Sequence, residues 1–168
     1  MRIWQPICAN PVPTAQAAIR ILLEELPVTL ADAQVAVIGY GRIGRVLTDL
    51  LKAMGAEVCV ASRGAAHTAQ TMPTGEYGPF LSCCDAVVNT APAPVLPAEA
   101  LERTRADCLI LDLASAPGGV DREAAARLHR RVRWELGLPG REFPVSAGRI
   151  IQAAVMRAML SPPCDAGG

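Results

Sequence analysis

The sequence is poor in aromatic residues, in lysine and in net charge. Phe, Trp and Tyr make up 4% of the 168 residues, and Lys52 is the one lysine beside fifteen arginines. Acidic and basic residues both number 16, so the formal net charge is zero. Nucleic-acid binding relies on clustered basic charge, and nothing of that kind is present. We therefore expect no nucleic-acid partner and a core made of Ala, Val, Ile and Leu.

Long apolar runs and paired metal ligands are also missing. No stretch of about 18 apolar residues occurs, so we expect no membrane span. The first residues, 1–6, have no signal-peptide pattern. The six cysteines include no CxxC pair and have no ligand spacing with His67 or His129. We therefore expect reduced thiols, no metal site and a cytoplasmic protein.

Short apolar runs alternate with segments of helical periodicity. Strands are predicted at 35–38, 58–61, 86–89, 108–111 and, at an edge, 132–134. Helices are predicted at 14–26, 43–54, 65–70, 98–103, 121–128 and 146–160, with loop or one short strand at 72–80. This alternation predicts an α/β fold of Rossmann type, with a doubly wound, mostly parallel sheet and flanking helices. We expect one domain at 14–160, an extended segment at 1–13 and a disordered tail at 161–168.

Three glycines form a G-x-G-x-x-G pattern between a predicted strand and a predicted helix. Gly39 would permit the tight turn, Gly41 would leave room for a pyrophosphate, and Gly44 would let the helix pack closely on the strand. The helix N-terminus would offer unpaired N–H groups to the phosphates, and Arg42 could add a charged contact. The alternatives are a tight turn without a ligand and a methyl-donor site.

The residues after the second predicted strand favour NADP. Dinucleotide folds that bind NAD carry an acid about 20 residues beyond the glycines, which holds the ribose. Here Ser62 and Arg63 occupy that region, and no Asp or Glu occurs between 58 and 75. Arg63 offers a planar fork of donors to a 2′-phosphate, and the alternative is that it is a solvated loop charge. We predict NADP, with NAD as the alternative cofactor.

Polar and small residues follow the later strands, at the sheet edge where open α/β folds bind ligands. The segments 89–94, 112–119 and 137–140 are rich in Pro, Gly and Ala, which suits rigid walls around a nicotinamide ring. Asp112 and Ser115 are candidates for positioning a substrate or a proton. Asp112 could equally be a loop or cap residue. His67, just beyond Arg63, is either an adenine contact or a surface residue.

Several motifs together resemble one family. They are NPVPTA at 10–15, VAVIGYGRIG at 35–44, LDLASAPGG at 111–119, GLPG at 137–140 and SAG at 146–148. In order and spacing, residues 9–160 resemble the first of the two subunits of dipicolinate synthase. The chain is more distantly similar to the cofactor domain of D-2-hydroxyacid dehydrogenases. Family members carry a further N-terminal domain that is missing here, and Ala116 stands where they have Arg.

The resemblance implies an NADP-linked oxidoreductase that makes dipicolinate from a dihydrodipicolinate-type precursor in sporulation, as a homo-oligomer with a second synthase subunit. Its implied pyrophosphate contacts are Gly39, Tyr40, Gly41, Arg42, Ile43 and Gly44. Those around the 2′-phosphate and adenine are Ser62, Arg63 and His67. Those on the nicotinamide side are Thr90, Ala91, Pro92 and Asp112. The alternative is a non-catalytic nucleotide-binding module that docks a partner protein or self-associates through the segments 14–26 and 146–160.

Overall fold

The fold is built on one parallel sheet. The computed structural model describes residues 11–63, 71–72 and 78–160. The strands are β1 (Gln34–Ile38), β2 (Glu57–Ala61), β3 (Thr71–Met72), β4 (Ala86–Asn89), β5 (Leu109–Asp112) and β6 (Arg131–Trp134). They form a six-stranded sheet in the order β3-β2-β1-β4-β5-β6, in which every neighbouring pair is parallel. The chain winds outward from β1 in both directions, which confirms the predicted doubly wound Rossmann-type fold.

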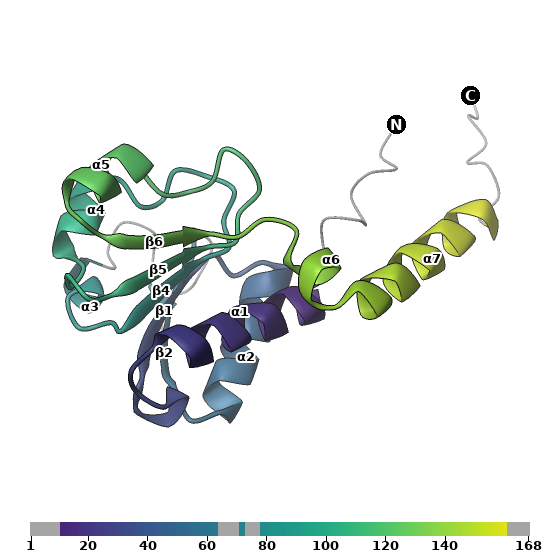
Figure 1. Ribbon diagram of the computed structural model, residues 1–168, viewed down its shortest axis with the longest axis horizontal. Coiled ribbons are helices and arrows are strands. Elements are labelled where there is room, and N and C mark those ends of the chain that lie inside the picture. Colours follow the sequence, from purple (N-terminus) through teal and green to yellow (C-terminus); the bar gives the residue numbers. More distant parts are fainter. Residues whose placement is uncertain (1–10, 64–70, 73–77, 161–168) are drawn as a thin grey trace.

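Helices cover both faces of the sheet. They are α1 (Pro11–Glu25), α2 (Arg42–Ala53), α3 (Gly78–Leu81), α4 (Ala98–Arg103), α5 (Arg122–Arg127), α6 (Leu138–Glu142) and α7 (Pro144–Leu160), with a 3-10 turn, η1, at Leu30–Asp32. Figure 1 shows α1 and α2 against one face and α3, α4 and α5 against the other. The layers are therefore helix, sheet and helix, as right-handed βαβ crossovers require.

The core is divided by the sheet into two apolar clusters. Successive side chains of a strand point to opposite faces. Val35 and Val37 accordingly pack with α1 and α2, while Ala36 and Ile38 pack with the residues of α3, α4 and α5. All four are nearly or fully buried. Such continuous burial explains why the strands appear in the sequence as unbroken apolar runs rather than as alternating patterns.

Helix α1 and residues 78–81 differ from the prediction. Helix α1 begins at Pro11 rather than at Thr14, so residues 11–13 are helical and Thr14 lies buried inside the helix instead of capping it. Proline is compatible with a first helical turn because the N–H groups there have no acceptor within the helix. Residues 78–81 form α3, where a loop or strand was expected. The predicted helix at 65–70 and the tail at 161–168 lie outside the described residues.

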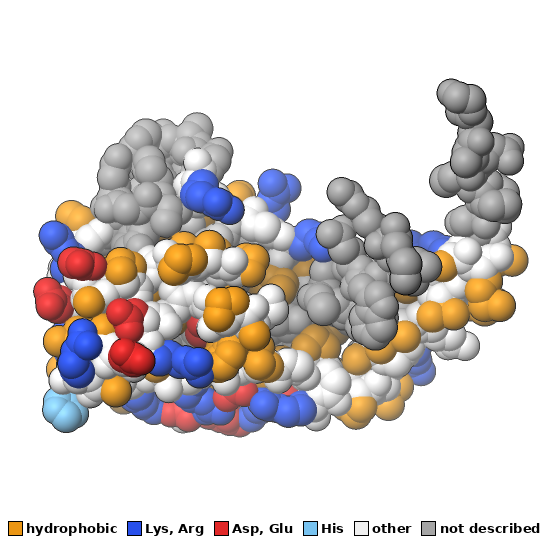
Figure 2. All heavy atoms as spheres, turned by 90° about the horizontal axis from the view of Figure 1, so that it is seen from above, with side chains coloured by type: hydrophobic (Ala, Val, Ile, Leu, Met, Phe, Trp, Pro, Cys, Tyr) orange, Lys and Arg blue, Asp and Glu red, His pale blue; other side chains and the backbone are white. Residues whose placement is uncertain are grey.

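Helix α7 projects from the domain as an arm (Figure 1). None of its residues is buried, and apolar side chains such as Ile151, Val155 and Met159 are exposed. Figure 2 shows hydrophobic side chains along the arm at the right of the view. The apolar stripe expected at 146–160 therefore exists, but no described residue covers it. Among the described helices, none is both long enough and apolar enough to cross a membrane.

The four described cysteines differ in accessibility. Cys59, Cys84 and Cys108 are buried free thiols, whereas Cys83 is exposed. Burial raises the pKa of Cys59 to about 11 and that of Cys108 to about 12. The pKa of Cys84 is raised for the same reason. Because the thiolate is the reactive form, the three buried cysteines should be inert.

We predict that iodoacetamide at pH 8 will modify Cys83 in the native protein but not Cys59, Cys84 or Cys108. Peptide mass spectrometry of the labelled protein would measure the modified fraction at each position. The matched control is the same reaction in urea, where all four should be modified. Rapid labelling of Cys84 without denaturant would contradict the packing described for this side of the sheet.

Candidate functional site

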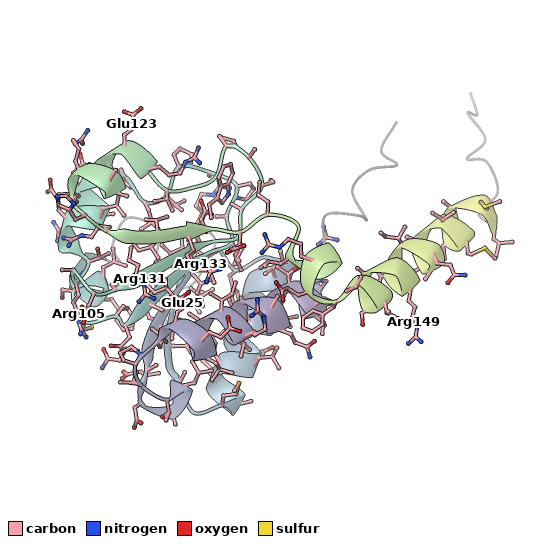
Figure 3. The ribbon with its side chains drawn as sticks, viewed as in Figure 1. Glu25, Arg105, Glu123, Arg131, Arg133 and Arg149 are labelled. Carbon is pink, nitrogen blue, oxygen red and sulfur yellow. The ribbon has the colours of Figure 1, made fainter. Side chains whose placement is uncertain are left out.

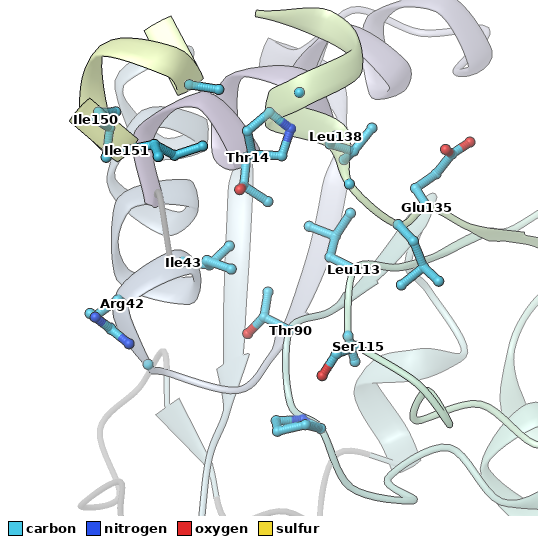
Figure 4. Close-up of a pocket in the computed structure, with 18 residues that line it drawn as sticks. Thr14, Arg42, Ile43, Thr90, Leu113, Ser115, Glu135, Leu138, Ile150 and Ile151 are labelled. Atoms are coloured by element: carbon cyan, nitrogen blue, oxygen red, sulfur yellow. The ribbon is translucent and has the colours of Figure 1, made fainter. Parts of the chain in front are cut away.

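A pocket of about 580 Å³ lies at the carboxyl edge of the sheet. Its walls come from Thr14 of α1, the glycine loop with the first turn of α2, the segments after β4, β5 and β6, and the first turns of α6 and α7. Figure 4 shows Arg42 and Ile43 on one side, Thr90 and Ser115 at one end, and Leu113 opposite. The site lies beyond the carboxyl ends of the neighbouring strands β1 and β4, where the strand order reverses and where doubly wound folds bind ligands.

The glycine loop has the geometry that its pattern predicts. Gly39 has φ +96°, and a Cβ there would lie 2.6 Å from the hydroxyl of Thr90. A Cβ on Gly44 would collide with the carbonyl of Gly39, so the helix packs directly on the turn. Gly41 has nothing within 4 Å of the corresponding position. The fold thus requires glycine at 39 and 44, whereas Gly41 leaves open space through which a ligand can approach the backbone.

The N-terminus of α2 faces this pocket. Gly41 is the N-cap residue, and Arg42 and Ile43 of the first turn line the pocket wall. The first N–H groups of a helix lack intrahelical acceptors and carry partial positive charge. Tyr40 lies outside the lining, with the guanidinium of Arg45 5.4 Å above its ring. The arrangement suits an anionic group such as a pyrophosphate.

Thr90 connects the glycine turn to β4. Its hydroxyl lies 3.1 Å from the carbonyl oxygen of Ile38 and 3.2 Å from that of Gly39, within reach to donate to either. Its backbone N–H donates to Ile38 at 2.8 Å. The side chain also lines the pocket. Thr90 therefore fixes the turn that presents the glycine loop and forms part of the wall beside it.

The predicted adenine side lies at the end of β2. Ile38 pairs with Ala61, and the N–H of Gly39 donates to the carbonyl of Ala61 at 2.8 Å, so Ser62 and Arg63 follow directly beside the glycine turn. Ser62 is half-buried and Arg63 is exposed. Neither lines the described pocket, which lies on the β4 side of the turn. His67 lies outside the described residues.

Asp112 does not occupy the position expected of a residue that contacts the substrate. Its side chain is 2% exposed and does not line the pocket. One carboxylate oxygen accepts hydrogen bonds from the Asn89 amide at 2.8 Å and from the Ala114 N–H at 3.0 Å. The other accepts from the Gly119 N–H at 2.8 Å. Sequence spacing placed Asp112 correctly at the end of a strand, but its side chain turns into the protein.

Of the other candidate residues near the nicotinamide side, two line the pocket and one does not. Pro92 and Ser115 are exposed and line the pocket. Ala91 does not line it, and its N–H instead donates to the Asn89 side chain at 2.9 Å. Ser115 is thus the one of the two predicted catalytic residues whose side chain can meet a ligand in this pocket.

The last part of the chain contributes walls that the sequence indicated only in part. Gly137 and Gly140 line the pocket as expected, but 138–142 form the short helix α6 rather than a loop. Glu135, Ile150 and Ile151 are lining residues that were not predicted. Periodicity had identified the two isoleucines as part of a helical stripe. No local pattern distinguishes Glu135 as a pocket residue.

Glu135 is held by two arginines. Its carboxylate accepts from Arg133 at 2.6 Å and from Arg141 at 2.5 Å. Burial raises its pKa, but the bonds from Arg141 and Arg133 outweigh burial and hold the pKa below its usual value. Arg133 also binds Glu25 at the end of α1, and Figure 3 shows Glu25 between Arg131 and Arg133. This network ties β6 and α6 to α1 beneath the pocket wall.

With the geometry established, comparison with known proteins identifies the family. Residues 20–119 match the model of the NAD binding domain of D-isomer specific 2-hydroxyacid dehydrogenases. The chain belongs to this family. The first subunit of dipicolinate synthase from Bacillus subtilis (strain 168) is 31% identical over 165 residues, covering 94% of the chain and 56% of that protein. The resemblance inferred from the motifs is thereby confirmed.

Solved structures of relatives agree with this family assignment. The crystal structure of the same dipicolinate synthase subunit from Bacillus halodurans superposes with a TM-score of 0.87 and 30% identity, covering 94% of the chain and 57% of that protein. A probable 2-hydroxyacid dehydrogenase from Rhizobium etli, solved with NADP, shares the fold at a TM-score of 0.66 and 17% identity, covering 89% and 64% respectively. The chain spans about half the length of the two dipicolinate synthase proteins.

We predict that Glu135→Gln lowers the free energy of unfolding at pH 7 by about 2 kcal/mol, because it removes two charge-assisted hydrogen bonds. The folded-state pKa of Glu135 is lowered, so its contribution is present above its unfolded pKa and is lost as pH falls through the folded value. Urea unfolding between pH 7 and pH 3 should therefore show the gap between variant and wild type closing on acidification.

The matched control for this prediction is Glu123→Gln. Glu123 is an exposed carboxylate in the first turn of α5 (Figure 3), so its loss should change stability much less. A gap for Glu135→Gln that stays constant from pH 7 to pH 3 would show that the ion pairs do not stabilise this wall.

Proposed function

We propose that the chain is the cofactor-binding part of an NADP-dependent oxidoreductase of dipicolinate synthase type, acting in the cytoplasm during sporulation. The reaction would oxidise a dihydrodipicolinate-type precursor to dipicolinate. The observation that carries the proposal is the open glycine loop at the N-terminus of α2, facing a pocket at the reversal of strand order. The family and the relatives from dipicolinate synthase support it.

The residues present fit a bound dinucleotide. The open space at Gly41 and the N–H groups of Arg42 and Ile43 would receive the pyrophosphate. Thr90, Pro92 and Ser115 would lie along the nicotinamide side. When bound, oxidised NADP supplies a hydride acceptor, and the chain orients it and provides a largely apolar wall through Leu113 and its neighbours.

The preference for NADP over NAD rests on the end of β2. Ser62 and Arg63 stand beside the glycine turn, and Arg63 is exposed. No acid occupies this position to hold a ribose hydroxyl or to repel a 2′-phosphate. The structure with NADP in a Rhizobium etli protein of the same fold is consistent with such a cofactor.

A second candidate function is a nucleotide-binding module without turnover of its own. Among the described lining residues the ionisable side chains are Arg42 and Glu135, and Glu135 is already bonded to two arginines. Ala116 supplies no charge where the resembling family has Arg. On this interpretation the reacting groups come from elsewhere in an assembly with a second synthase subunit, which fits a relative that is itself one subunit of a synthase.

The homo-oligomer that we propose would use α7. This helix exposes Ile151, Val155 and Met159 and carries two basic residues, Arg149 and Arg157, with no acidic residue. A helix that is apolar around most of its circumference is ordinarily buried. Pairing with a second copy would cover this surface and close the side of the pocket lined by Ile150 and Ile151.

We predict that Arg63→Glu weakens NADP binding about tenfold or more while leaving NAD binding nearly unchanged, because it replaces a donor to the 2′-phosphate with a like charge. Calorimetric titration of wild type and variant with both cofactors measures this. The matched control is Arg149→Glu, which makes the same charge change on the exposed arm (Figure 3).

A third variant separates this assignment from the glycine loop itself. Gly41→Val should abolish binding of both cofactors and change the urea midpoint little, because a Cβ at this position has no atom within 4 Å and the branched side chain would fill the approach to the backbone. Equal losses of NADP and NAD in Arg63→Glu would refute the 2′-phosphate contact. Full affinity in Gly41→Val would refute the loop as the cofactor site.

For the oligomer, we predict that the double change Ile151→Glu and Val155→Glu converts a concentration-dependent dimer into a monomer. Two charges in an apolar helix–helix contact are strongly unfavourable. Light scattering coupled to size exclusion measures the mass across a concentration series. Gln152→Glu, on the same arm, is the control for charge alone. A wild-type chain that is monomeric at every concentration would contradict self-association.

A further inference from the structure

We propose that Asn89 and Asp112 form a buried positioning pair that sets the two loops of the nicotinamide side, and that neither contacts the substrate or cofactor. This deepens, and in its functional part rests on, the function proposed above. Asn89 is 0% exposed and Asp112 is 2% exposed, although both end strands at the ligand edge of the sheet. They are direct partners in the β4–β5 register.

Each polar atom of the pair has a specific loop partner. The Asn89 amide N–H₂ donates to Asp112 at 2.8 Å and to the carbonyl of Ala91 at 3.1 Å, and its oxygen accepts from the Ala91 N–H at 2.9 Å. The Asp112 carboxylate accepts from the N–H groups of Ala114 and Gly119. A buried hydrogen-bond network is rigid when every polar group in it has a partner, whereas a buried polar group without a partner lowers the stability of the fold.

The two glycines after Pro117 let the loop close around this pair. A Cβ on Gly118 would lie 2.8 Å from the Asp112 carboxylate, and one on Gly119 would collide with the Asn89 amide. Gly118 also has φ +88°, which disfavours other residues. Glycine is therefore required at the end of the LASAPGG segment because the backbone there packs directly against the Asn89 and Asp112 side chains.

The pair controls pocket residues that it does not touch. Thr90 and Pro92 lie on the loop whose Ala91 is bound on both sides by Asn89, and Ser115 follows Ala114, which is bound by Asp112. Trp134 of β6 donates to the carbonyl of Ala114 at 2.9 Å and closes the outer side. The loops that carry these pocket residues are thus held by four hydrogen bonds from the pair, and the Asn89–Asp112 bond joins the two loops at the strand ends.

The pair can be tested with Asp112→Asn, which changes shape little. Asn has one acceptor oxygen, so in either orientation its N–H₂ opposes an N–H from Gly119 or from Ala114 and Asn89. We expect binding of oxidised NADP to weaken about tenfold, while binding of adenosine 2′,5′-bisphosphate, which lacks the nicotinamide half, stays unchanged. Calorimetry with these two probes measures the split.

The matched control is Asp121→Ala. Asp121 also accepts from a backbone N–H, that of Ala124 at 2.9 Å, but it caps α5 and does not line the pocket. This variant should lower the thermal midpoint and leave the affinities for both probes unchanged. If Asp112→Asn behaves in the same way, or loses both affinities equally, the pair only stabilises the fold and the proposal is wrong.

Amide hydrogen exchange tests the pair without any cofactor. In Asp112→Asn, whichever of the Ala114 and Gly119 N–H groups loses its acceptor oxygen should exchange at least about tenfold faster, relative to wild type, than the amides of β1 do. A uniform rise across the sheet would overturn the positioning role. If the wild type binds neither probe, the proposed function fails, and this measurement alone then decides whether the pair fixes the loops.

Discussion

The amide of Asn89 donates a hydrogen bond to the carboxylate of Asp112 where the neighbouring strands β4 and β5 end, and both side chains are buried. An amide beside a carboxylate supplies both donors and acceptors, so the strand ends can be buried without an unsatisfied group. The next residue after Asn89 is Thr90, whose hydroxyl contacts the glycine turn. The adjacent residues Asn89 and Thr90 therefore connect the segment after β5 and the glycine turn, which form two sides of the pocket.

The fold was predictable because its signals are local. Unbroken apolar runs such as 35–38 indicate strands buried on both faces, and the glycine spacing requires a strand on one side and a helix on the other. Backbone sterics explain the glycines at 39 and 44, where a Cβ would collide with the turn, whereas Gly41 leaves open space for a ligand. These inferences need no knowledge of which distant segments meet.

The site was predictable only in part, because side-chain direction and distant partners are not local. Asp112 was correctly placed at a strand end, but nothing in the sequence shows that Asn89, 23 residues earlier, would draw it inward. Helix α6 was missed because Gly137 and Pro139 are typical of turns. In the structure Gly137 adopts the left-handed conformation as the N-cap, and Pro139 fits the first turn. Glu135 becomes recognisable only once Arg133 and Arg141 surround it.

The order of the strands has a kinetic consequence. The central strand β1 precedes its neighbour β4 in the chain, with both β2 and β3 between them, and the contact between Gln34 and Asp85 spans 51 residues. Loop-closure entropy must be overcome before such a distant pairing yields any stabilisation. Half of the sheet can therefore assemble only after residues 86–89 have been synthesised. The pocket is lined by residues from Thr14 to Ile151, so its walls are complete only when both halves of the sheet and the beginning of α7 are in place.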